Sequence, residues 1–112
     1  MSQITTHILD TSSGKPAADV ALKLEKKTAD GWQTLAVGRT NADGRVSDLL
    51  PKDAVLPVGV YKMTFDTEGY FAAQNLPTFY PNVDISFYVR DGGHYHIPLL
   101  LSPFGFTTYR GS

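Results

Sequence analysis

The chain has 112 residues, a length typical of a single domain with one hydrophobic core. It is 42% hydrophobic and 19% charged, a composition too apolar for a disordered chain, and its formal net charge of -1 disfavours nucleic acid as a partner. With no cysteine, the sequence excludes disulfides, thiolate nucleophiles and thiolate metal ligands.

Most of the chain alternates apolar and polar residues between turns rich in Gly, Pro, Asn and Asp, which is typical of β-strands. The expected strands, in chain order, are Ile4–Leu9, Val20–Glu25, Trp32–Arg39, Arg45–Val46, Val58–Phe65, Val83–Arg90, His94–Leu101 and Phe104–Tyr109. Residues 10–16 are all turn formers and are expected to form a loop.

One segment, Glu68–Leu76, has a helical pattern, and Pro77 would end that helix. Eight short strands at this spacing predict an all-β sandwich of two antiparallel sheets, formed by one domain over residues 1–112. Within the strand that covers residues 94–101, Pro98 is expected to produce strain or a bulge, because a central strand needs every backbone N–H. Tyr61, Met63 and Phe65 are expected in the core.

Strand alternation predicts that two histidines lie on the outer face of one sheet. If Ile8 points into the core, His7 points away from it, and the same reasoning with Ile97 places His96 outward. Each of these imidazoles, and likewise Arg45 after a tight turn, could be an exposed side chain without a role. Apolar residues share this outer face with the histidines, however, which favours contact with another subunit. We therefore expect an oligomer with its site near an interface.

The His94-Tyr95-His96 spacing also allows a metal site, because residues two apart on a strand point to the same side. No clear third ligand accompanies the pair, so no metal and no cofactor are expected. A Ser-His-Asp triad is disfavoured as well, since the chain has no Gly-x-Ser-x-Gly motif.

Four separated motifs resemble the transthyretin-related proteins and cover essentially the whole chain. They are Ile4-Thr5-Thr6-His7-Ile8-Leu9-Asp10 followed by Gly14-Lys15-Pro16-Ala17, then Gly38-Arg39-Thr40-Asn41-Ala42-Asp43-Gly44-Arg45, then Tyr95-His96-Ile97-Pro98-Leu99-Leu100-Leu101-Ser102-Pro103, and finally Tyr109-Arg110-Gly111-Ser112. The last tetrapeptide resembles the ending of the 5-hydroxyisourate hydrolases, the enzymatic branch of that family. The resemblance implies a prealbumin-like (transthyretin-like) sandwich of two four-stranded antiparallel sheets with one short helix, assembled as a homotetramer around a central channel.

The resemblance also implies a reaction. It is the hydrolysis of the six-membered ring of 5-hydroxyisourate to 2-oxo-4-hydroxy-4-carboxy-5-ureidoimidazoline in urate degradation, without a metal. The catalytic residues would be His7, Arg45 and His96, and substrate would be bound by His7, Arg45, Tyr109 and Ser112. Which histidine activates water and which returns the proton stays open. A neighbouring guanidinium is expected to keep a histidine neutral. Arg110 alternates with Tyr109 and would anchor the tail.

Two other function classes remain open at this point. One is a non-catalytic small-molecule carrier of the transthyretin type, whose channel would need apolar walls. The other is an adhesion or interaction sandwich, which would be monomeric. No window is apolar enough for a membrane helix, and the N-terminus lacks an export signal, so a cytoplasmic protein without membrane contact is expected; a chain processed before cloning would look the same.

Overall fold

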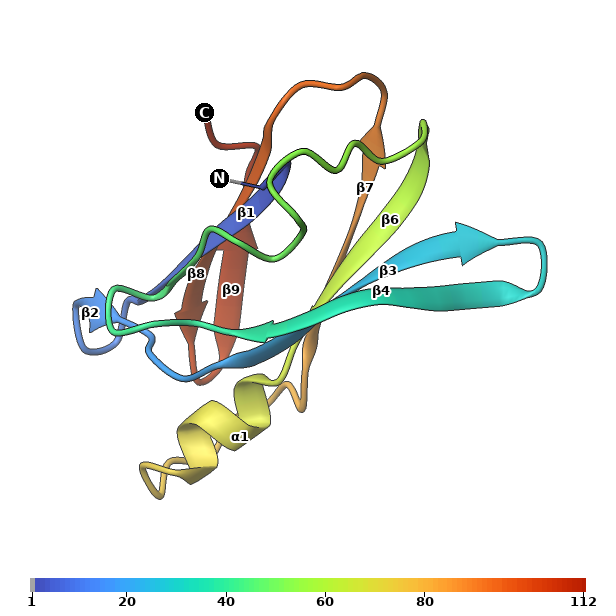
Figure 1. The fold of residues 1–112 in the computed structure, drawn as a ribbon. Helices are drawn as coiled ribbons and strands as arrows, with labels where there is room; N and C mark the ends of the chain where they lie inside the picture. Colours follow the sequence, from blue (N-terminus) through green and yellow to red (C-terminus); the bar gives the residue numbers. More distant parts are fainter. Residues whose placement is uncertain (1) are drawn as a thin grey trace.

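The computed structural model describes residues 2–112, which form nine strands and one helix. In chain order the elements are β1 (Ile4–Asp10), β2 (Lys15–Pro16), β3 (Ala21–Thr28), β4 (Gly31–Arg39), β5 (Arg45–Val46), β6 (Gly59–Phe65), α1 (Thr67–Ala72), β7 (Val83–Val89), β8 (Tyr95–Ser102) and β9 (Gly105–Thr108). The helix covers one end of the sandwich, and the start of β1 lies near the C-terminal end of the chain at the other end (Figure 1). No helix within residues 2–112 has the length and apolar character that a membrane span requires.

Two sheets face each other, as predicted. One has the strand order β2-β1-β8-β9, with β5 also paired to β1, and the other has the order β4-β3-β6-β7. The prediction of antiparallel pairing is wrong for one pair, because β1 and β8 run parallel from Ile4↔Tyr95 to Asp10↔Leu101. The two-residue strand β2 was expected to be a loop, since Lys15-Pro16 has no apolar alternation. This strand pairs with the end of β1 through its backbone.

Alternate residues of the facing strands fill the core. Ile4 and Ile8 of β1 have no exposed surface, and Tyr61, Met63 and Phe65 of β6 are fully buried as predicted. Burying one such side chain stabilises the fold by about 1.5–3 kcal/mol. Thr5 and His7 alternate with these isoleucines and point to the other face, so the hydrophobic effect fixes which face of β1 carries His7.

Pro98 does not create a bulge, contrary to the sequence prediction. The β1–β8 register runs through it without a shift, because odd-numbered residues of β8 bond to β1, as shown by the Tyr95 N–H that donates to the Gln3 carbonyl. Even-numbered residues bond toward the β9 side, where the Gly111 N–H donates to the His96 carbonyl. The N–H that Pro98 lacks would therefore face Tyr109, and there the β8–β9 ladder is interrupted.

The helix is shorter than its sequence pattern and connects β6 to β7 of the same sheet. Its N-cap is Asp66, whose carboxylate accepts the Gly69 N–H at 2.9 Å, and Phe71 packs into the core. Beside it, the Tyr70 hydroxyl donates to Oδ2 of the buried Asp10 at 2.8 Å. Burial, followed by this hydrogen bond, raises the pKa of Tyr70 to about 12.

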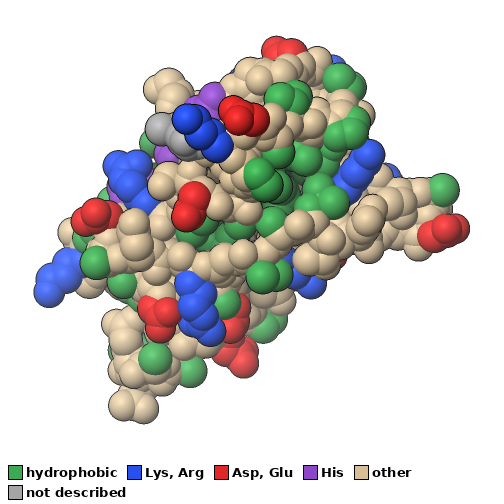
Figure 2. All heavy atoms as spheres, viewed as in Figure 1, with side chains coloured by type: hydrophobic (Ala, Val, Ile, Leu, Met, Phe, Trp, Pro, Cys, Tyr) green, Lys and Arg blue, Asp and Glu red, His purple; other side chains and the backbone are tan. Residues whose placement is uncertain are grey.

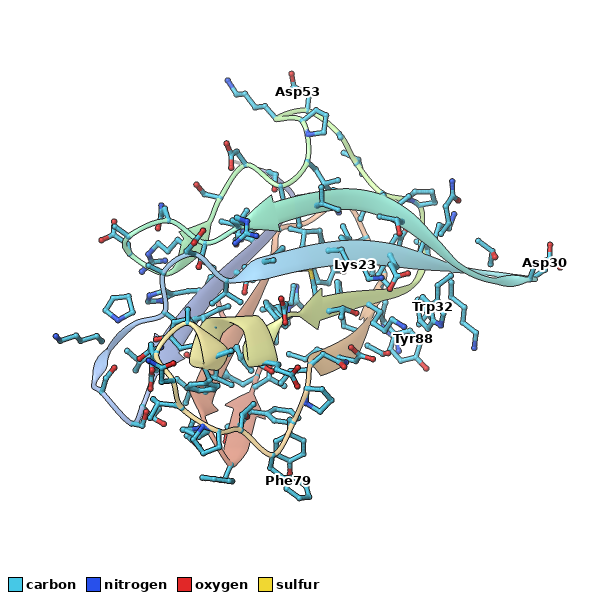
Figure 3. All side chains as sticks on the ribbon, turned by 90° about the horizontal axis from the view of Figure 1, so that it is seen from below. Lys23, Asp30, Trp32, Asp53, Phe79 and Tyr88 are labelled. Carbon is cyan, nitrogen blue, oxygen red and sulfur yellow. The ribbon has the colours of Figure 1, made fainter. Side chains whose placement is uncertain are left out.

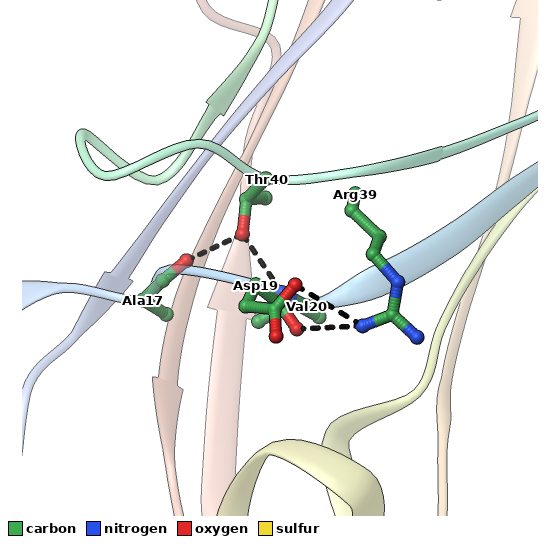
Figure 4. A network of polar contacts seen from close by, with 5 residues as sticks. All are labelled: Ala17, Asp19, Val20, Arg39 and Thr40. Carbon is green, nitrogen blue, oxygen red and sulfur yellow. Dashed lines mark hydrogen bonds and ion pairs between the residues drawn. The ribbon is translucent and has the colours of Figure 1, made fainter.

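A buried threonine ties the segment before β3 to the end of β4. The Thr40 hydroxyl donates to the Ala17 carbonyl at 2.7 Å and accepts the Val20 N–H at 2.9 Å, while Arg39 pairs with the side chain and carbonyl of Asp19 at 3.2 Å (Figure 4). These bonds hold the chain just before the turn that leads to β5.

The second sheet carries a hairpin that extends well beyond the sandwich. The β3–β4 hairpin has Asp30 near its tip, and Trp32 and Tyr88 lie at the same end of the molecule (Figure 3). The Lys62 ammonium sits 4.3 Å from the Trp32 ring centroid, a cation–π contact. None of the residues proposed for catalysis lies on this sheet.

Candidate functional site

The first sheet brings the three proposed catalytic residues together from strands far apart in the sequence. β1 lies between β5 and β8, so that His7 pairs with Arg45 on one side and Thr5 pairs with His96 on the other. Because residues 5 and 7 share a face of β1, all of these side chains emerge on the outer face of the sheet. Figure 2 shows histidine side chains beside basic side chains in the region where the termini lie.

A small cavity of about 130 Å³ opens among these residues. Its lining includes Arg45, His96 and Ser112, together with Thr5, Thr6, Val46, Ser47 and His94. His7 does not line this cavity, although it is close enough for its charge to contribute to the pKa of His96. Strands β1, β5 and β8 and the C-terminal tail thus all contribute to one pocket.

His96 is half-buried and shares a hydrogen bond with a partner that the sequence analysis did not identify. Its Nδ1 lies 2.8 Å from the Thr5 hydroxyl, and the same hydroxyl lies 2.8 Å from Nε2 of His94. The rings of His94 and His96 are stacked, with centroids 6.3 Å apart. Nε2 of His96 has no hydrogen-bonding side chain among the described residues, so this nitrogen is the one that can act on a ligand.

Burial is the main cause that lowers the pKa of His96 below its ordinary value of 6.5, followed by the charges of His94, Arg45 and His7. The direction agrees with the sequence prediction. The principal cause differs, since the prediction rested on Arg45 alone. A lowered pKa leaves the imidazole of His96 neutral at neutral pH, with a lone pair that can accept a proton.

The C-terminal tail rejoins the sheet beyond the interruption at Pro98. Gly111 forms a bridge with His96 in the same register as β9, and a Cβ added to Gly111 would lie only 2.5 Å from Cδ2 of His96. Glycine is thus required for this close approach of the backbone to the ring. The bridge brings Ser112 to the cavity that contains Arg45.

The two residues before Gly111 border the same second cavity, and their expected opposite directions stay a prediction. The Arg110 guanidinium lies 4.4 Å from the Tyr95 ring centroid and donates to the His94 carbonyl at 3.5 Å, which anchors the tail. Tyr109 is exposed and lines a different cavity of about 430 Å³, which also reaches His96. The structure therefore does not place Tyr109 in the cavity that contains Arg45 and Ser112.

Thr5 and Gln3 are the site residues that sequence reasoning missed. Gln3 is buried, donates to the carbonyls of Asp91 and Gly93 at 3.2 and 3.1 Å, and so holds the loop that leads to His94. The one available signal was that Thr5 shares a face with His7. The two histidines considered for a metal site each place one ring nitrogen 2.8 Å from the Thr5 hydroxyl. Residues 2–112 contain no group of three or more His, Cys, Asp or Glu side chains arranged to hold a metal ion.

The chain resembles known proteins over nearly its whole length. Residues 4–111 match the model of the HIUase/Transthyretin family. The chain is 44% identical to the 5-hydroxyisourate hydrolase of Caulobacter vibrioides, over the full length of both chains, and 44% identical to that of Mus musculus, over 99% of this chain and 96% of the mouse protein.

Solved structures agree as well. The Klebsiella pneumoniae 5-hydroxyisourate hydrolase superposes with a TM-score of 0.86 at 38% identity, over 97% of this chain and 98% of the other. Sea bream transthyretin in complex with thyroxine superposes with a TM-score of 0.90 at 39% identity, over 97% and 94%. With two sheets, one short helix and a match over nearly every residue, the chain belongs to the HIUase/transthyretin family.

Proposed function

We propose that the chain is a hydrolase that opens the six-membered ring of 5-hydroxyisourate in urate degradation, without a metal or other cofactor. The observation that carries this proposal is that Arg45, His96 and Ser112 line one small cavity, with His7 paired to Arg45 beside it. Two relatives that are 44% identical over nearly the full length of the chain bear the name of this activity.

His96 is the better candidate for the base that activates water. Its imidazole is neutral at neutral pH because its pKa is lowered, and its Nδ1 is held by Thr5, which leaves Nε2 for the water. Addition of that water to an amide-like carbonyl would place negative charge on the carbonyl oxygen, which needs a nearby donor.

Arg45 is assigned to that charge. Its planar guanidinium can donate two parallel hydrogen bonds to the edge of a urate-like ring, which a lysine ammonium cannot reproduce. Return of a proton to the ring nitrogen that leaves is assigned to His7, which lies beside the cavity as the cross-strand partner of Arg45. Ser112 would position the substrate in the same cavity, and Tyr109 would do so from the far side of His96.

We further propose that the protein is a homotetramer and that the site is completed at a subunit interface. A cavity of about 130 Å³ is below the range typical of small-molecule sites, about 300–1,000 Å³, so a second copy would be needed to enclose the substrate. Leu9 and Leu100, only half-buried beside the histidines, provide apolar surface for that contact. Size-exclusion chromatography with light scattering tests this, and a monomer that retains full activity would contradict it.

The decisive experiment for the reaction is the decay of the ultraviolet absorbance of freshly generated 5-hydroxyisourate with purified protein. We expect acceleration that is insensitive to a chelator and is lost in both Arg45→Lys and His96→Gln. A transthyretin-type carrier, the alternative function, would bind a hydrophobic aromatic ligand stoichiometrically and leave the decay at its spontaneous rate.

A further inference from the structure

We infer that Thr5 and His94 are positioning residues that set which nitrogen of His96 carries the proton, so that the protonation state of His94 controls whether His96 can act as a base. The inference rests on the proposed role of His96 and goes beyond it, because it assigns a function to two residues outside the catalytic set.

The geometry of one hydroxyl carries the argument. The Thr5 Oγ1 lies 2.8 Å from both Nε2 of His94 and Nδ1 of His96, and no other described residue is a hydrogen-bond partner of this oxygen. A hydroxyl has one proton to donate and lone pairs to accept. Thr5 is almost fully buried, so its proton goes to one of these two rings, and the other ring must donate to Thr5.

Two arrangements follow, and they have opposite consequences for the cavity. When His94 is neutral and accepts the Thr5 proton at Nε2, His96 donates from Nδ1 and its Nε2 carries a free lone pair. When His94 is protonated, its Nε2 must donate to Thr5, Thr5 then donates to Nδ1 of His96, and Nε2 of His96 carries a proton. In the first arrangement His96 is a base toward the cavity, and in the second it is a donor.

Several contacts hold this chain of three groups in place. Thr5 and His96 are register partners in the parallel β1–β8 pair, which fixes the distance between them. The Gln3 side chain donates to the Gly93 carbonyl, and the Arg110 guanidinium donates to the His94 carbonyl. These two bonds hold the backbone next to His94, the exposed member of the three groups. A fixed geometry makes the coupling depend on proton placement and not on rotation of the side chains.

His94 and His96 each have charged or titratable neighbours. The groups toward His96 are His7 on β1, Arg45 on β5 and His94 itself, and burial acts in the same direction as their charges to disfavour a proton on His96. Arg110 of the tail contacts the His94 carbonyl. Lys52 and Asp53, in the loop between β5 and β6, line a cavity that His94 also lines. His94 is exposed whereas His96 is half-buried, so His94 is the ring of the pair that is open to solvent.

Three variants separate the hydroxyl from its packing. Thr5→Val keeps the shape of the side chain and removes the hydroxyl, and we expect kcat to fall by at least about tenfold, about 1.4 kcal/mol, with KM little changed. Thr5→Ser keeps the hydroxyl and is expected to stay within about threefold of the parent in kcat. His94→Gln accepts the Thr5 proton but cannot titrate, so its optimum rate is expected to stay normal while its acid limb becomes shallower.

A second measurement does not need substrate. Nitrogen-15 NMR of the histidine rings distinguishes an Nδ1 proton from an Nε2 proton. We expect His96 to carry its proton on Nδ1 at neutral pH and to shift toward Nε2 as His94 is protonated, and we expect Thr5→Val to abolish this linkage.

The outcomes distinguish the inference from the proposed function. Full activity in Arg45→Lys and His96→Gln would overturn the proposed site. If those two variants lose activity but Thr5→Val keeps an unchanged rate and pH profile, only the inference is overturned. Equal impairment of Thr5→Ser and Thr5→Val would also overturn it, and so would a His96 ring that carries its proton on Nε2 at neutral pH. If Thr5→Val does not fold, Thr5→Ser, His94→Gln and the NMR titration still decide the question.

Discussion

Replacing Gly111 with alanine should impair catalysis without disturbing the fold. The added Cβ would lie 2.5 Å from Cδ2 and 3.3 Å from Cγ of His96, and 3.0 Å from Cγ of Pro98, whereas ordinary contacts begin at 3.4 Å. The ring is held at Nδ1 by Thr5 and cannot rotate away without losing that bond. Either the ring or the tail must therefore move by about 1 Å, a displacement that costs about 100-fold in rate at a reacting centre.

The assay is kcat from the absorbance decay of 5-hydroxyisourate, with the thermal midpoint of unfolding measured in parallel. A 100-fold loss corresponds to about 2.7 kcal/mol in the activation barrier. Gly111 lies outside the core, and we expect the midpoint to change little. Gly105→Ala is the matched control, because its Cβ would meet only Ser102 Oγ at 3.7 Å in the same strand pair. A Gly111→Ala variant as active as this control would refute the reasoning.

Three further predictions concern charge and stability. Arg45→Lys should lower kcat/KM by about 100–1,000-fold with an unchanged oligomeric state, measured by the absorbance decay and light scattering, because a point charge cannot replace the two-donor guanidinium. Between its lowered pKa and the ordinary value of 6.5, His96 binds less proton in the folded than in the unfolded chain, so the free energy of unfolding should decrease as pH falls through that window, and urea titrations of His96→Gln should lack this slope. Tyr70→Phe should lower the free energy of unfolding by about 1–3 kcal/mol in urea, because Asp10 is buried and loses a donor, whereas Tyr88→Phe on the surface should not; equal effects would contradict the role of the Asp10 bond.

Period-two alternation was enough to predict the sandwich, the core of β6 and the outward direction of the histidines, because it depends only on which neighbours are apolar. It could not show Thr5 beside His96. That contact depends on the register between β1 and β8, which no local pattern specifies, and the parallel direction of this pair was likewise missed. The same limit hid the contact between His94 and the Thr5 hydroxyl, since the sequence offered His94 only as an exposed side chain or as a metal ligand together with His96.

Pro98 shows a different limit. A proline inside a strand predicts disruption, but the effect depends on which neighbour its nitrogen faces. Here the pairing with β1 does not require a hydrogen bond from the Pro98 nitrogen. The missing hydrogen bond falls on the β9 side, opposite Tyr109. Sequence alone does not contain that direction, because it follows from how many strands flank β8 and on which sides.

The pairing of β1 with β8 has a consequence for how activity is acquired during synthesis. Thr5 and His96 are 91 residues apart, so an emerging polypeptide holds the first partner long before the second exists. No nascent fragment that stops short of β8 can present the pocket, and contacts so distant in sequence form late and slowly. Enzymatic turnover therefore requires the complete sandwich, and an incomplete nascent chain cannot bind a reactive purine derivative in this pocket.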